Sequence, residues 1–149
     1  FPFHSDALHG EKVGVGTILI SRACHKLAEI EDITPYVHPY SMIPASQLEP
    51  FYGPALYPSI VEENKKDCME GVTPEMLIKA WPEIRRIIST IPAPEELSAL
   101  YEKIGAKKTL EDIEVPSEYL PQLLKFSPSA RNRLTLMRVC RMLDIPELS

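Results

Sequence analysis

Apolar residues recur at helical spacing through residues 6–27, and this segment is the one around which we expect the chain to fold. A helix that is apolar around most of its circumference is buried in a protein core. We therefore predict a buried helix that begins at Ser5 or Asp6, whose side chains can cap it, and ends near Glu31. Its two apolar ridges run through Val13, Thr17, Ile20, Cys24 and Leu27 and through Val15, Ile18, Leu19 and Ala23.

Two glycines lie inside this segment, and each weakens a helix by about 1 kcal/mol relative to alanine. A sequence that keeps Gly14 and Gly16 at such a cost usually needs another backbone or a ligand to approach closely. Polar residues gather at the entry of the helix, as in a binding site built at a helix N-terminus. These entry residues are His4, Ser5, Asp6, His9, Glu11 and Lys12.

Helix start and stop signals recur along the rest of the chain. Pro82 is expected to break or kink one helix, and Gly105 is expected to end another. Residues 109–112 fit a turn that resembles a capping box. No segment alternates with period two between turn signals, so the predicted class is all-α, a helical bundle. The predicted helix starts are Thr73, Pro94, Ser117 and Ser127.

Six prolines alternate with aromatic residues in residues 33–58. Each proline disfavours helix at the preceding residue and lacks an amide donor. We therefore predict an extended or turn-like segment that crosses the surface of the domain, followed by a short helix from Ser59 to Asn64. A docking segment for another domain is disfavoured, because the PxxP spacing that polyproline recognition needs is not repeated cleanly.

Composition narrows the class of protein. The 149 residues are 44% hydrophobic, which suits one ordinary core and predicts a single domain over residues 1–149. A net charge of -5 and a pI near 5.4 argue against a nucleic-acid-binding protein. Cys24, Cys68 and Cys140 lack CxxC spacing, which favours a reduced, cytoplasmic protein. The longest apolar stretch, residues 13–20, is too short to span a bilayer.

The entry of the first predicted helix carries a motif. The run His9-Gly10-Glu11-Lys12-Val13-Gly14-Val15-Gly16-Thr17-Ile18-Leu19 resembles the segment of glycerol and glycerol-1-phosphate dehydrogenases in which a metal-ligating histidine opens a long helix. These enzymes belong to the iron-containing alcohol dehydrogenase and dehydroquinate synthase-like group. Three more runs resemble the glycerol-1-phosphate dehydrogenase branch: residues 91–97, 104–106 and 129–136.

The resemblance implies that the chain is most of the all-helical, C-terminal metal-binding domain of such an enzyme. In this group a nucleotide-binding domain comes first, and no dinucleotide fingerprint occurs here. Gly14-Val15-Gly16 follows no predicted strand and lacks the G-x-G-x-x-G spacing. We therefore expect the N-terminal nucleotide-binding domain to be absent from this chain and to precede it in the complete protein.

The resemblance also assigns His9 as a metal ligand, whereas a lone histidine beside a buried helix is otherwise interpreted as a structural residue. Neutral imidazole binds Zn(II) or Fe(II) well, and a catalytic site needs about three protein ligands and one open position. The other ligands of the family, an aspartate and a histidine, lie upstream, and no residue here matches them. His4 is interpreted as a surface histidine, Glu11 as a helix cap and Lys12 as a solvated or ion-paired side chain.

For two further groups of residues we favour a structural role over a functional one. The arginines of the last predicted helix could meet a substrate phosphate, but a solvated or intersubunit basic face is expected. Cys24, beside His25, is expected to be buried and not to act as a nucleophile. The arginines are Arg131, Arg133, Arg138 and Arg141.

The implied function is the C-terminal domain of a metal-dependent NAD(P) polyol or polyol-phosphate dehydrogenase, inactive by itself. The alternatives are a non-catalytic helical interaction or scaffold domain, and a dehydroquinate synthase-like lyase domain. The expected cofactors are Zn or Fe and NAD(P) in the complete enzyme, with none held tightly by this chain. The expected partners are the nucleotide-binding domain, a small polyol or polyol phosphate and a second copy of the chain, without nucleic acid or membrane.

Overall fold

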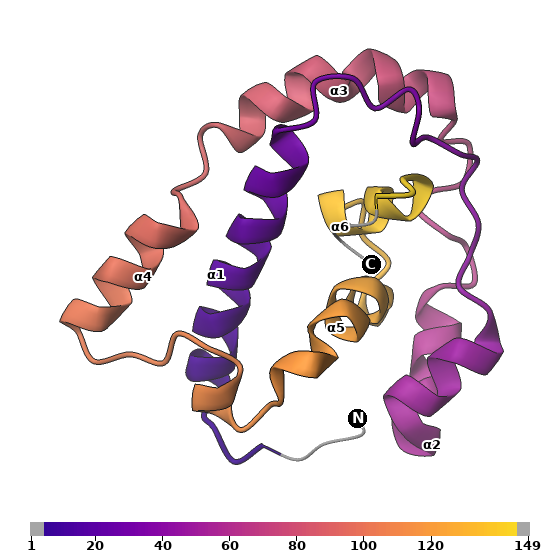
Figure 1. The fold of residues 1–149 in the computed structure, drawn as a ribbon. Helices are drawn as coiled ribbons and strands as arrows, with labels where there is room; N and C mark the ends of the chain where they lie inside the picture. Colours follow the sequence, from indigo (N-terminus) through magenta and orange to yellow (C-terminus); the bar gives the residue numbers. More distant parts are fainter. Residues whose placement is uncertain (1–4, 146–149) are drawn as a thin grey trace. The chain divides into compact units, whose positions relative to one another are not determined.

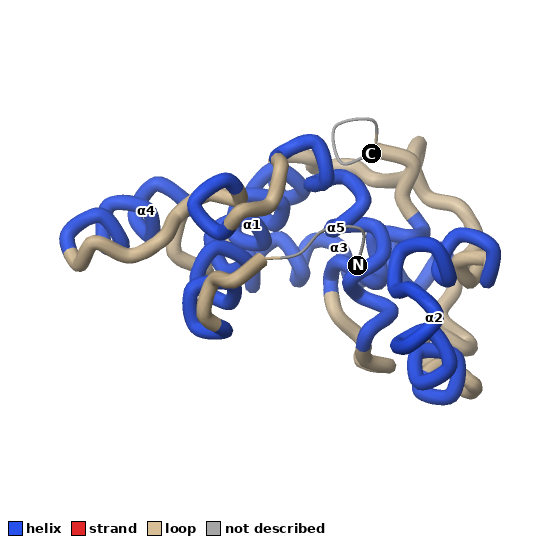
Figure 2. Tube along the Cα trace, turned by 90° about the horizontal axis from the view of Figure 1, so that it is seen from below, coloured by secondary structure: helices blue, strands red, loops and turns tan. Residues whose placement is uncertain are grey.

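The computed structural model describes residues 5–145, and these residues form an all-α structure (Figures 1 and 2), which confirms the all-α part of the predicted class. No strand occurs in this range, where one isolated antiparallel bridge joins Val37 and Leu143. The α-helices are α1 (His9–Ala28), α2 (Ala45–Glu63), α3 (Pro74–Ile88), α4 (Pro94–Lys103), α5 (Leu120–Phe126) and α6 (Leu136–Val139). The short 3-10 helices are η1 (Glu111–Ile113), η2 (Ser117–Tyr119), η3 (Ser127–Ala130) and η4 (Cys140–Met142).

The chain divides into two compact units, each made of segments that are distant in sequence. The α1 unit consists of residues 5–31 and 80–118, and the α2 unit consists of residues 32–79 and 119–145. The division falls inside α3, between Lys79 and Ala80. The single domain expected over residues 1–149 stays a prediction.

The entry of α1 differs from the prediction. The helix begins at His9, not at Ser5 or Asp6, and its N-cap residue is Leu8. The Leu8 amide donates to the Glu11 carboxylate at 2.8 Å, so the predicted capping role of Glu11 is confirmed. The Ser5 hydroxyl donates instead to the Ile113 carbonyl of η1 at 2.5 Å. Because the Ser5 side chain makes this long-range bond, it does not cap α1. The helix begins instead at His9, where Glu11 supplies the cap.

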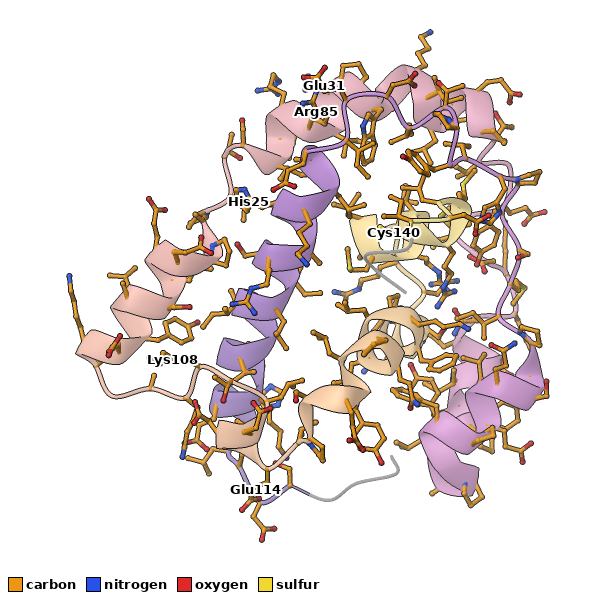
Figure 3. The ribbon with its side chains drawn as sticks, viewed as in Figure 1. His25, Glu31, Arg85, Lys108, Glu114 and Cys140 are labelled. Carbon is orange, nitrogen blue, oxygen red and sulfur yellow. The ribbon has the colours of Figure 1, made fainter. Side chains whose placement is uncertain are left out.

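The end of α1 is fixed by side chains from α3. The helix ends at Ala28, earlier than the predicted Glu31, and the free carbonyls beyond its last turn are bonded. Arg85 Nε donates to the Ala28 carbonyl at 2.8 Å, and Trp81 Nε1 donates to the Ile30 carbonyl at 2.8 Å. Figure 3 shows Arg85 and Glu31 near this helix end, where they form an ion pair at 3.9 Å. Such bonds satisfy acceptors that a helix end otherwise leaves to water.

Burial along α1 is one-sided. Val15, Ile18 and Leu27 are at most 1% exposed, whereas Val13 is 53% exposed and Ile20 is 38% exposed. The prediction of a helix buried nearly all round is therefore wrong for the first part of one ridge, at Val13, Thr17 and Ile20, whereas Cys24 and Leu27 of the same ridge are buried. Apolar periodicity alone did not distinguish a core ridge from an exposed one.

The predicted approach of another backbone or a ligand is seen at neither glycine, although Gly14 has a close neighbour. A Cβ placed on Gly14 would lie 3.0 Å from Cε2 of Tyr101 in α4, so Gly14 allows this ring to approach α1. Nothing lies within 4 Å of a Cβ placed on Gly16. The close neighbour at Gly14 is a side chain of the same unit and not a backbone or a ligand.

The central segment of the sequence contains one confirmed helix start, and of the two predicted effects of Pro82, a break or a kink, the break does not occur. The Thr73 hydroxyl accepts from the Met76 amide at 3.3 Å, as a residue that caps α3 should. The helix then runs on to Ile88 without stopping at Pro82. Further along, Gly105 takes a φ of 65° just after α4, and Asp112 accepts from the Thr109 amide at 3.1 Å, so both local signals are confirmed.

The proline-rich segment is helical over half of its length. Residues 33–44 are irregular, as predicted, but α2 covers residues 45–63 in two pieces that meet at Gly53, which has a φ of 74°. Pro54 follows this break and can open the second piece, because the first helical position needs no amide donor. Phe51, Tyr52 and Ile60 are buried, and their burial outweighs the disfavoured local propensity.

The last predicted helix is interrupted. Residues 127–130 form η3, Arg131 is extended, and α6 begins only after Thr135, whose hydroxyl accepts from the Arg138 amide at 3.3 Å. The prediction of one helix from Ser127 is therefore wrong. After the interruption, the Arg138 side chain is buried in the α2 unit. None of the helices described between residues 5 and 145 is both long and apolar enough to cross a membrane.

Candidate functional site

His9 is the first residue of α1, and its side chain is exposed. The neighbouring polar residues hold the helix entry. Glu11 caps the Leu8 amide, and Lys12 Nζ donates to the Ser5 carbonyl at 2.9 Å. Lys12 is thus tied to the entry, by a hydrogen bond to a carbonyl. No residue between 5 and 145 hydrogen-bonds the imidazole of this exposed histidine.

The described residues around His9 do not supply enough ligands for a metal site. Residues 5–145 bring together no group of three or more His, Cys, Asp or Glu side chains that could hold a metal ion. His4 lies outside the described residues. A single exposed imidazole fits one ligand of a zinc or iron site, and the remaining ligands would have to come from other residues.

The neighbouring thiol and imidazole further along α1 have structural roles. Cys24 is 4% exposed, and burial raises the pKa of its thiol, which disfavours the reactive thiolate. This confirms the prediction that Cys24 is buried. Nε2 of His25 lies 3.0 Å from the Ile91 carbonyl, and the Ser21 hydroxyl donates to the Pro92 carbonyl at 2.7 Å. These bonds fasten α1 to the segment that leads into α4.

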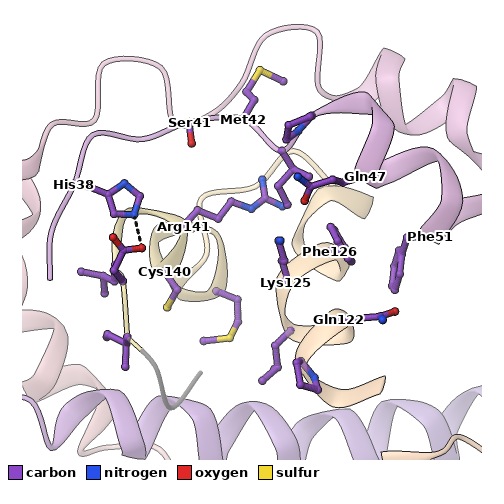
Figure 4. Close-up of a pocket in the computed structure, with 18 of the residues that line it drawn as sticks. His38, Ser41, Met42, Gln47, Phe51, Gln122, Lys125, Phe126, Cys140 and Arg141 are labelled. Carbon is purple, nitrogen blue, oxygen red and sulfur yellow. Dashed lines mark ion pairs between the residues drawn. The ribbon is translucent and has the colours of Figure 1, made fainter. Parts of the chain in front are cut away.

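A pocket of about 1240 Å³ opens within the α2 unit (Figure 4). Its walls come from residues 38–51, from α5 and from residues 137–145. Most of the lining side chains are apolar, and they include Met42, Phe51, Leu124 and Phe126. A largely apolar pocket with a few polar groups is the usual form of a small-molecule site.

Two cations line this pocket. Arg141 of η4 is half-buried, and its Nη2 donates to the Ser129 hydroxyl at 2.5 Å. Its Nε is buried and has no hydrogen-bond partner among residues 5–145. Lys125 of α5 is exposed, with its Nζ 5.2 Å from the centroid of the Phe126 ring. A buried donor without a partner costs roughly 1–3 kcal/mol, so an acceptor at Arg141 Nε would be favoured.

One side of the pocket is closed by a short pairing of two extended segments. The His38 amide donates to the Met142 carbonyl at 2.9 Å, and the Asp144 amide donates to the Tyr36 carbonyl at 2.9 Å. The His38 ring also faces Asp144, with Nε2 and Oδ1 separated by 3.4 Å (Figure 4). The Asp144 side chain is 86% exposed, so its charge is largely screened by water.

A buried polar network lies in the same unit and centres on Arg138, which is 1% exposed. Its Nε lies 3.6 Å from Asp67 Oδ1, its Nη1 donates to the Arg131 carbonyl at 3.0 Å, and its Nη2 donates to the Asn64 side chain. The prediction of a solvated basic face is therefore wrong for Arg138. Its charge is neutralised by Asp67, so this arginine is structural.

Two tyrosines lie near these arginines. Burial raises the pKa of Tyr52 to about 12, although the positive charges of Arg141 and Arg138 oppose the shift. Its hydroxyl donates to the Phe126 carbonyl at 2.7 Å. Burial also raises the pKa of Tyr40, whose hydroxyl donates to Asp67. Both phenols are therefore neutral donors at physiological pH.

The sequence predicted the place of His9 but not the pocket. Arg141 was expected on an exposed basic face, and Lys125 and His38 were assigned no role. The pocket joins residues 38–51 to residues 119–145, and no local signal reports such a distant pairing.

Comparisons of the chain with protein-family models, curated proteins and solved structures return no match. The resemblance to the glycerol-1-phosphate dehydrogenase branch therefore rests on the sequence motifs alone, and the fold stands as all-α.

Proposed function

We propose that this chain is the helical metal-binding domain of an NAD(P)-linked dehydrogenase that acts on a polyol or polyol phosphate. The observation that carries the proposal is the accessible imidazole of His9 at the first position of α1, within the motif that resembles this class. An imidazole whose nitrogens were taken up by structural hydrogen bonds could not serve as a ligand.

The residues around His9 keep its position fixed. The Glu11 cap and the Lys12 bond to Ser5 hold the first turn of α1, and the Tyr101 ring against Gly14 holds the helix to α4. His9 would bind the metal through a neutral ring nitrogen, with further ligands from outside this chain. When bound, the divalent zinc or iron polarises the substrate hydroxyl or carbonyl as a Lewis acid.

The remaining chemistry belongs to the proposed N-terminal domain. Hydride transfer needs the nicotinamide and the reacting carbon within about 3–3.5 Å, and a separate nucleotide-binding domain would provide that placement. We further propose that the complete enzyme is a cytoplasmic homo-oligomer.

The coding sequence upstream of Phe1 tests the proposal first. It should encode a dinucleotide-binding domain with an aspartate and a histidine that complete the ligand set of His9. The complete protein should then oxidise glycerol or a glycerol phosphate with NAD or NADP, and chelation should abolish this turnover. An upstream sequence without such a domain would favour a scaffold domain. Turnover of a non-polyol substrate by elimination would favour the lyase.

A further inference from the structure

We propose that the pocket of the α2 unit binds a small organic anion with an apolar portion, held by Arg141 and Lys125. This site lies wholly within residues 38–51 and 119–145, so the inference does not depend on a metal role for His9.

Arg141 supplies the main anion-binding group. Its side chain bonds the neutral hydroxyls of Ser129 and Tyr40, and no carboxylate within residues 5–145 pairs with it. Its buried Nε has no acceptor in that range either. A guanidinium with unused donors matches the paired oxygens of a phosphate or a carboxylate. An anion in the pocket would therefore be a suitable further partner for the Arg141 guanidinium.

Lys125 adds a second cation at the same pocket. Its ammonium lies near the Phe126 ring, whose centroid is 5.0 Å from that of Phe51. Figure 4 shows the charged ends of Lys125 and Arg141 pointing toward the same part of the pocket, with Gln47 beside it. The aromatic contact keeps the ammonium at the pocket without neutralising it.

The balance of charge and polarity defines the ligand class. Asp144 is the carboxylate of the lining, and its charge faces His38, so the two cations leave the pocket positive. The remaining wall is mainly apolar, with Met42, Phe51 and Leu124 among its side chains. An inorganic ion would leave the apolar side chains of the wall exposed to water. An anion with a short hydrocarbon chain would bury them, which is favourable.

The test is isothermal titration of the full chain with four probes, three with a six-carbon chain and one without a chain. These are hexyl phosphate, hexanoate, 1-hexanol and inorganic phosphate. At least one of the two hexyl anions should bind, and each such anion should bind about tenfold or more tightly than 1-hexanol and inorganic phosphate. Comparing hexyl phosphate with hexanoate distinguishes a phosphate ligand from a carboxylate ligand.

Three variants locate the binding. Arg141→Gln should weaken the bound anion about tenfold or more, and Lys125→Glu should weaken it several-fold to tenfold. Arg133→Gln removes an exposed cation of the same unit that does not line the pocket, and it should leave the affinity unchanged. Lys125 is exposed, so its variant remains informative even where Arg141→Gln fails to fold.

The following results would overturn the inference. They are absence of binding by both hexyl anions, binding of 1-hexanol as tight as that of the anions, binding of inorganic phosphate as tight as that of hexyl phosphate, and unchanged affinity in Lys125→Glu. An equal loss in Arg133→Gln would also overturn it, because the effect would then be one of net charge.

Discussion

Gly14 and Tyr101 are in such close approach that a single methyl group added to Gly14 would lie 3.0 Å from the ring edge. The contact joins α1 to α4 inside the α1 unit. The neighbouring Gly16 has open space where its side chain would be. These two glycines lie two residues apart, on nearly opposite faces of α1, and therefore form a matched pair for substitution.

Gly16→Ala should raise the free energy of unfolding by about 0.5–1 kcal/mol, because alanine is the better helix former and meets no neighbour. Gly14→Ala should gain less or lose stability, because the Tyr101 ring must shift. Urea unfolding of the two variants measures the difference. In a Tyr101→Ala background the two glycine substitutions should become equivalent, and a persisting difference would show that the ring is not the cause.

Arg138→Ala should destabilise the α2 unit by about 3–5 kcal/mol, because it leaves Asp67 without its buried counter-charge. Arg138→Lys should recover only part of the loss, since an ammonium cannot reproduce the bonds of the guanidinium to Asn64 and to the Arg131 carbonyl. Thermal and urea unfolding give both values.

The matched control is Arg133→Ala, which removes an exposed arginine from the same segment and should change stability by no more than about 0.5 kcal/mol. Equal effects at positions 133 and 138 would contradict the structural role of Arg138.

Tyr52 predicts a pH dependence of stability at the alkaline end. Its pKa is about 12 in the folded protein and 10.0 ordinarily, so between these values the unfolded chain loses the proton first. The stabilisation is fully present below about pH 10 and is lost as the pH rises through about 12. Absorbance at 295 nm should show late phenolate formation, to which Tyr40 also contributes, and Tyr52→Phe should remove the part near pH 12. Tyr36→Phe removes an exposed phenol and should leave that part in place.

Local signals in the sequence predicted local structure well. The Thr73 cap, the Thr109 and Asp112 turn and the Gly105 stop each involve residues within a few positions of one another. Such bonds depend only on nearby residue types, so a pattern can report them.

The sequence failed where distant segments decide the conformation. α2 is helical despite its prolines because Phe51 and Tyr52 bury against residues 123–130. The helix expected from Ser127 is interrupted because Arg138 pairs with Asp67 across the unit. The candidate metal ligand was found through a contiguous motif, whereas the pocket around Arg141 is assembled from two distant segments.

The 149-residue chain by itself should show no turnover of glycerol-like substrates with NAD or NADP, because the proposal gives it a single metal ligand, His9, and its sequence carries no dinucleotide fingerprint. The isolated chain should also self-associate, because several apolar side chains are exposed. Leu8, for example, is 71% exposed. Absorbance at 340 nm and sedimentation velocity measure the two properties. Turnover by the isolated chain, or one tightly held zinc or iron, would mean that it is a complete enzyme.

The central claim is that His9 ligates a catalytic metal, and the metal content of the complete protein tests it most directly. The wild-type protein and a His38→Ala variant should each contain about one zinc or iron per chain by elemental analysis. His9→Ala should lose the metal by at least about tenfold in affinity while its helical circular dichroism is unchanged. Undiminished metal in folded His9→Ala protein would contradict the assignment.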